Sequence, residues 1–112
     1  SSLSSLFHEN GPFIFMPGEE QHLTINDYAW NKRANLLYFE LPAGVGFSTS
    51  ANSSLEFNDI DTAETAFHTL RQFYARFPDY RGRDLYLTGH GYAAVFHSYL
   101  AKRIIEYNED PY

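Results

Sequence analysis

Short apolar runs separated by turn residues fill the first half of the chain. Residues 1–10 are small and polar with a few apolar positions, which predicts a short helix or a loop. The apolar run from Phe13 to Met16 lies between Gly-Pro and Pro-Gly and predicts a strand, and residues 21–26 predict a second one. Residues 35–41 are almost continuously apolar, a pattern typical of a parallel strand that is buried on both faces.

The spacing of apolar residues changes in the second half of the chain. From Asp59 to Phe77 it follows the three- and four-residue period of an amphipathic helix. Asp59 or Asp61 is expected to cap the start of this helix, and Pro78 to end it. The intervening residues 42–58 are rich in Gly, Ser and Asn and predict a long loop.

A further strand–helix pair follows. Residues 84–89 (DLYLTG) predict a short buried strand, and residues 92–107 a second amphipathic helix. Alternating apolar strands and helices favour an α/β fold with parallel strands and right-handed crossovers. We therefore expect residues 1–112 to form a single partial α/β domain, with short N-terminal strands followed by strand, helix, strand and helix. Its sheet would be incomplete without a partner or further chain.

Composition narrows the classes of function. The net charge is −6 without a dense Lys/Arg cluster, which argues against nucleic acid as a partner. No apolar run approaches the roughly 20 residues of a membrane span, and the absence of cysteine excludes disulfides and thiolate metal sites within this chain. The aromatic content of 18% predicts a large apolar surface that is buried or covered. Because the chain begins Ser-Ser-Leu, we expect processing or a longer parent protein.

The turn between the last predicted strand and helix is the main candidate for chemistry. Many hydrolases place a nucleophilic serine at the centre of G-x-S-x-G between a strand and a helix, where the backbone is strained and the helix N-terminus faces the oxyanion. The corresponding residues here are Gly89-His90-Gly91-Tyr92-Ala93, and Gly91 has no side chain that could attack. From these residues, a glycine-rich turn that never held chemistry stays open as an alternative.

Other polar residues give weaker signals. His68 and His97 fall within predicted helices, where a lone histidine is more often a surface or packing residue. His8 and His22 lack metal-ligand spacing. We expect no cofactor and no metal. Asn52 begins an Asn-Ser-Ser sequon and is a candidate for glycosylation.

Four stretches of the chain resemble the serine carboxypeptidases, which have the α/β-hydrolase fold. They are SSL…ENGPF over residues 1–13, YAWNKRANLLYFELPAGVGFS over 28–48, FYARFPDYRGRDLYLTG over 73–89, and GHGYAA over 89–94. The last stands where the family has Gly-Glu-Ser-Tyr-Ala-Gly. Order and spacing are kept over essentially the whole chain.

The resemblance implies a role for each matching position. Gly91 stands at the nucleophile position, and the Tyr92 backbone N–H would form part of the oxyanion hole. Glu9 and His90 correspond to the two glutamates that hold the substrate's terminal carboxylate, so that only Glu9 of this pair is retained. The second oxyanion donor would precede residue 1. The family's triad aspartate and histidine come later in the chain than the matched stretches.

Three functions are compatible with this pattern. The first is an inactive serine-carboxypeptidase-like segment that serves as a structural or interaction subunit, with a protein partner or further chain segments covering its open sheet. The second is a segment of an active serine-type carboxypeptidase that releases C-terminal residues from peptides. The third is a module that binds a ligand through Glu9, His90 and Tyr92 without catalysis. The resemblance suggests a vacuolar, lysosomal or secreted location, and a large organellar assembly is also compatible.

Overall fold

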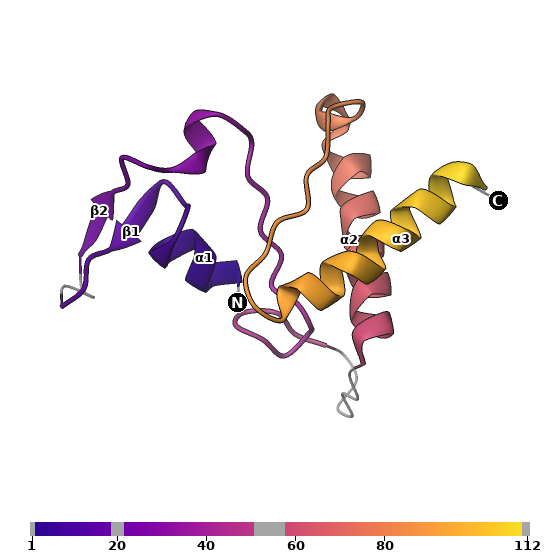
Figure 1. Ribbon diagram of the computed structural model, residues 1–112, viewed down its shortest axis with the longest axis horizontal. Coiled ribbons are helices and arrows are strands. Elements are labelled where there is room, and N and C mark those ends of the chain that lie inside the picture. Colours follow the sequence, from indigo (N-terminus) through magenta and orange to yellow (C-terminus); the bar gives the residue numbers. More distant parts are fainter. Residues whose placement is uncertain (1, 19–21, 51–57, 111–112) are drawn as a thin grey trace. The chain divides into compact units, whose positions relative to one another are not determined.

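The computed structural model describes residues 2–18, 22–50 and 58–110 (Figure 1). The chain divides into two compact units, Ser1–Ser53 and Ser54–Tyr112. Both helices and strands are present, which is consistent with the expected partial α/β fold.

The first unit contains a short helix and a small antiparallel hairpin. Helix α1 spans Ser2–His8, strand β1 Phe13–Phe15 and strand β2 Leu23–Ile25, and a 3-10 turn, η1, follows at Trp30–Lys32. Phe13 pairs with Ile25 in the β1–β2 ladder. The rings of Phe7 in α1 and Phe15 in β1 lie 5.7 Å apart, so that α1 packs against the hairpin. The two N-terminal strands predicted from the turn signals are therefore confirmed.

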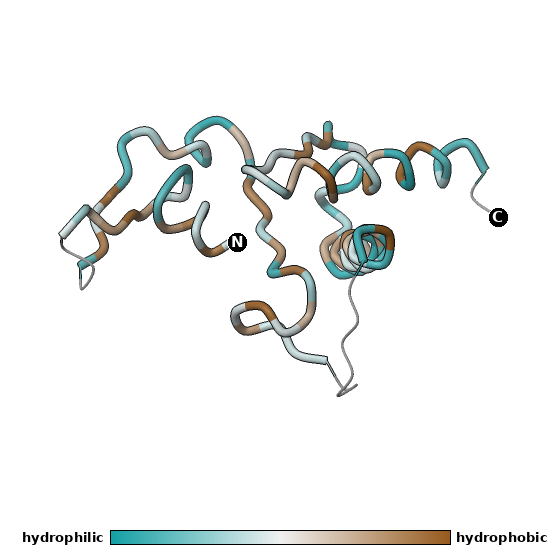
Figure 2. Tube along the Cα trace, turned by 60° about the horizontal axis from the view of Figure 1, so that its bottom comes forward, coloured by the Kyte–Doolittle hydropathy of each residue, from teal (hydrophilic) through white to brown (hydrophobic). Residues whose placement is uncertain are grey.

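The second unit is a pair of packed helices. Helix α2 spans Asp59–Arg76 and helix α3 spans Ala93–Glu109, with a 3-10 turn, η2, at Pro78–Tyr80. The two long helices cross each other (Figure 1). Hydrophobic and hydrophilic positions alternate along α3, as expected of an amphipathic helix (Figure 2). The buried residues of the pair are Thr62, Ala63, Ala66, Phe67, Leu70 and Leu100.

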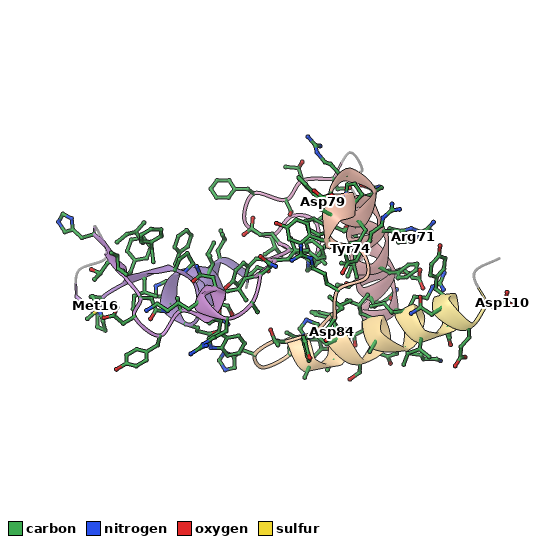
Figure 3. All side chains as sticks on the ribbon, turned by 90° about the horizontal axis from the view of Figure 1, so that it is seen from above. Met16, Arg71, Tyr74, Asp79, Asp84 and Asp110 are labelled. Atoms are coloured by element: carbon green, nitrogen blue, oxygen red, sulfur yellow. The ribbon has the colours of Figure 1, made fainter. Side chains whose placement is uncertain are left out.

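The ring of Phe67 is the centre of the contact between α2 and α3. Its side chain is 2% exposed, and the ring of Tyr107 meets it edge-on at 5.3 Å. The guanidinium of Arg103 lies over the Phe67 ring at 4.6 Å and donates to Glu64 at 2.8 Å. Arg71, which projects from α2 in Figure 3, lies 4.9 Å from the centre of the Tyr107 ring. Cation–π contacts therefore join the two helices at the buried Phe67 and the half-buried Tyr107.

The start of α2 differs in detail from the sequence prediction. The capping residue is Asn58, whose side-chain oxygen accepts the backbone N–H of Asp61 at 2.8 Å. Asp59 and Asp61 lie in the first turn, where negative charge favours the helix. The helix ends at Arg76 with Phe77 as its C-cap, one residue before Pro78, because a proline disfavours helical backbone in the residue that precedes it.

The structure corrects the prediction of buried parallel strands at 35–41 and 84–89. Neither segment forms a strand, and the only ladder among the described residues is the antiparallel β1–β2 pair. Leu37 is 46% exposed and Tyr86 is 78% exposed. The physical reason is that a strand is defined by hydrogen bonds to a neighbour, and neither segment forms a backbone ladder with the described residues.

Within residues 2–18, 22–50 and 58–110, no helix is long and apolar enough to cross a bilayer.

Candidate functional site

The turn at residues 89–93 leads directly into α3. Gly91 has a φ of +63°, in the left-handed region that favours glycine. The carbonyls of His90, Gly91 and Tyr92 accept the first N–H groups of α3, at 3.3, 3.1 and 3.0 Å. The N–H of Tyr92 has no acceptor among the described residues, as expected at the start of a helix. An anionic oxygen at this helix start would therefore meet an available donor.

Gly89 and Gly91 face different surroundings. A Cβ at Gly89 would lie 2.7 Å from the Cβ of Ala93 and 2.8 Å from the His97 Nδ1, so that only glycine lets the chain approach α3 this closely. A Cβ at Gly91 would meet nothing within 4 Å. Gly91 is therefore favoured by its backbone angle, whereas Gly89 is required by packing.

The side chain of Tyr92 is tied to the start of α2. Its hydroxyl donates to the Asp59 carboxylate, with oxygen–oxygen distances of 2.9 and 3.1 Å. This hydrogen bond, together with the negative charge of Asp59, raises the pKa of Tyr92 above its ordinary value of 10.0. The hydroxyl that follows Gly91 in the chain is therefore held in its neutral form.

His97 contacts the turn from one helical turn further along α3. Burial lowers the pKa of this imidazole, since the charged form loses solvation. The neutral form is thus favoured in the folded state. Its contribution to stability is present above the ordinary value of 6.5 and is lost as the pH falls through the folded-state pKa.

The remaining predicted site residues are spread along the chain. Glu9 follows α1 in the first unit, and its charge helps to raise the pKa of Tyr38 after the larger effect of burial. His90 lies in the second unit and is exposed. The carboxylate-binding role of Glu9 and His90 stays a prediction, and Asn52 lies outside the described residues. Among the residues described, no three His, Asp or Glu side chains gather where they could hold a metal ion.

The structure also shows contacts to the predicted site residues from residues for which the sequence analysis expected no such role. Asp59 was predicted only as a helix-start residue, and its contact with Tyr92 joins positions 33 apart in the chain, for which no sequence signal exists. Tyr38 donates to the side-chain oxygen of Asn10 at 2.5 Å, and the side-chain Nδ2 of Asn26 donates to the backbone carbonyl of Glu9 at 3.3 Å.

Comparison with known proteins places this turn in its family. The family model described as serine carboxypeptidase matches residues 1–112. The chain belongs to the serine carboxypeptidase family. This confirms the resemblance found from the four stretches, and the helices and strands of the two units are consistent with part of the α/β fold of that family.

Relatives from three organisms match nearly all of the chain. It is 42% identical over 106 residues to the lysosomal protective protein of Mus musculus. The matched region covers 95% of this chain and 22% of the relative. It is 43% identical over 105 residues to serine carboxypeptidase ctsa-4.1 of Caenorhabditis elegans (94% and 22%). It is 45% identical over 103 residues to serine carboxypeptidase-like 25 of Arabidopsis thaliana (90% and 22%). The chain thus spans about a fifth of the length of these relatives.

Because Gly89 and Gly91 have different surroundings, their substitutions should differ in how their effects on the free energy of unfolding combine with His97→Ala. Gly89→Ala should destabilise the native protein by about 1–3 kcal/mol through overpacking, and Gly91→Ala by about 1–2 kcal/mol through the left-handed backbone. Combined with His97→Ala, the Gly89 variant should be non-additive by more than about 0.5 kcal/mol, because removing the ring relieves part of the clash. The Gly91 variant should be additive. Urea unfolding of the single and double variants measures both terms, and equal coupling at the two positions would contradict the packing.

The hydrogen bond between Tyr92 and Asp59 predicts a titration change. Asp59→Asn should lower the pKa of Tyr92 toward 10.0, because the acceptor charge that favours the neutral phenol is removed. The stabilising effect of this hydrogen bond should be complete below pH 10.0 and lost as the pH rises through the folded-state pKa. Ultraviolet titration measures the shift, with Tyr92→Phe in both backgrounds identifying the signal. An unchanged titration in Asp59→Asn would show that the contact is absent in solution.

Proposed function

We propose that this chain is a segment of a serine-carboxypeptidase-like protein that does not form an acyl-enzyme at residues 89–93 and serves as a structural or interaction element. The observation that carries the proposal is the backbone at Gly91. Its φ of +63° is the kind of strained angle that a nucleophile adopts between a strand and a helix, yet the residue offers no oxygen.

Two hydroxyls near the turn, those of Tyr92 and Ser98, are already engaged in hydrogen bonds. The Tyr92 hydroxyl donates to Asp59, which keeps it protonated and directed toward α2. The hydroxyl of Ser98, about two helical turns beyond Gly91, donates to the carbonyl of Ala94 at 2.9 Å. Both oxygens are engaged in hydrogen bonds that an attack on a carbonyl would have to break.

Serine-type carboxypeptidase activity is the second candidate function. It is favoured by the identity of 43% to a relative that is itself called a serine carboxypeptidase. For this function a hydroxyl other than one at position 91 must attack the substrate. The non-catalytic ligand-binding module, with Glu9, His90 and Tyr92 as its lining, needs no attacking group and is tested by binding alone.

Covalent labelling of the native protein distinguishes an inactive segment from an active serine-type carboxypeptidase. A fluorophosphonate probe reacts with activated serines, so we expect no adduct on residues 89–98 and no hydrolysis of an N-blocked dipeptide above the rate of a heat-denatured sample. The double variant Gly91→Ser with His90→Glu should gain the adduct only where the remaining triad groups are present. An adduct on the unmodified chain at any hydroxyl, found by peptide mass spectrometry, would overturn the proposal.

The apolar residues exposed in each unit support a covering by a protein partner or by further chain. Ile25 in β2 is 69% exposed, and Leu85 and Tyr86 in the extended segment before the turn are 44% and 78% exposed. Exposed apolar side chains beside unpaired backbone are the usual mark of a surface that another segment covers.

Hydroxyl-radical footprinting of the native protein tests this covering. Tyr86 and Ile25 should react at least about tenfold more slowly than in the urea-unfolded protein, because a covering segment excludes the radical. Met16, which is 42% exposed, serves as an internal reference for the radical dose in both samples. Reactivity of Tyr86 and Ile25 equal to that in the unfolded protein would show an open surface and contradict the covering.

A further inference from the structure

The backbone of residues 9–12 has all four of its carbonyl groups hydrogen-bonded. Asn26 binds three of them. Its side-chain Nδ2 donates to the carbonyls of Glu9 and Gly11 at 3.3 and 2.9 Å, and its backbone N–H donates to that of Pro12 at 2.9 Å. The backbone N–H of Trp30 donates to the fourth, that of Asn10, at 3.0 Å. A four-residue loop with this many fixed carbonyls has very little freedom to rotate.

Asn26 itself is a buried residue whose polar groups are all used. It is 4% exposed. Its side-chain oxygen accepts the N–H of Tyr28 at 3.0 Å, and its backbone carbonyl accepts that of Ala29 at 3.2 Å. Because a buried amide costs free energy unless it is fully hydrogen-bonded, the residue is held in this one orientation.

Further contacts fix the loop from its other sides. A Cβ at Gly11 would lie only 2.8 Å from the carbonyl carbon of Leu6, so α1 approaches the loop as closely as glycine permits. The hydroxyl of Tyr38 donates to the side-chain oxygen of Asn10 at 2.5 Å. The backbone N–H groups of Glu9 and Asn10 donate to the carbonyl of Ser5 at 3.2 and 3.0 Å.

We propose that Asn26 is a positioning residue that sets the backbone of Glu9 and thereby the direction of the Glu9 carboxylate. Glu9 is the residue that the family resemblance assigns to binding a peptide's terminal carboxylate, and its side chain is exposed at the end of α1. A residue that recognises a ligand gains affinity when its direction is fixed before binding, since less conformational entropy is then lost. This role needs no nucleophile and goes beyond the function proposed above.

Peptide binding to the native protein provides the test. The probes are a fluorescein-labelled tripeptide with a free C-terminal carboxylate and the same peptide as its C-terminal amide. Asn26→Ala should weaken binding of the free acid by about tenfold, comparable with the loss of one hydrogen bond, and leave the amide unchanged. Asn26→Asp keeps the acceptor for Tyr28 but loses both donors, so it should weaken binding at least as much. Asn31→Ala, an exposed asparagine of the same unit, is the matched control and should bind like the unmodified protein.

Amide hydrogen exchange separates positioning from general loss of structure. In both Asn26 variants, exchange at residues 9–11 should rise while exchange at residues 62–70 of α2 stays unchanged. Unchanged affinity in variants whose residues 9–11 have loosened would overturn the proposal. So would exchange that rises throughout the chain, or an unmodified protein that does not prefer the free acid. None of these results changes the outcome of the fluorophosphonate experiment, so the two proposals fail separately.

Discussion

The close approach of the chain to α3 at Gly89 is the constraint on which the candidate site depends. Ala93 and His97 occupy the space that a side chain at this position would need, so the extended segment enters the helix at one distance only. The carbonyls of the turn then accept the first helical N–H groups, and Gly91 takes its left-handed angle. The shape of the turn is therefore set by packing against the helix and does not depend on which side chain, if any, stands at its centre.

The helices could be predicted from the sequence, and the larger sheet could not. Apolar spacing located α2 to within one residue at its end and α3 to within two, because that period follows from the geometry of a single helix. The apolar runs at 35–41 and 84–89 have the composition of strands, but a strand also needs a neighbour, which no local pattern supplies. Asn58 was missed as the cap because either of two acidic residues nearby satisfied the same sequence rule.

The residues of the candidate site could likewise be predicted only in part. The glycines, Tyr92 and Glu9 could be found because they belong to contiguous motifs that match the family. The contacts of Tyr92 with Asp59 and of Asn26 with the loop at 9–12 join residues far apart in sequence, and only the fold brings them together. Replacing Asn26 should cost more stability than replacing Tyr92. The amide of Asn26 is buried and fully hydrogen-bonded, whereas the phenol of Tyr92 is exposed.

Because the space around Gly91 is open, the chemistry of this position can change independently of the packing of the turn. A Cβ added there meets nothing within 4 Å, so a small side chain can be introduced without displacing the neighbouring residues. The cost of any L-residue is confined to its own backbone, about 1–2 kcal/mol. At this position the side chain therefore determines reactivity, whereas the backbone determines the shape of the turn. A lineage can lose the attacking oxygen here in a single replacement while its architecture persists.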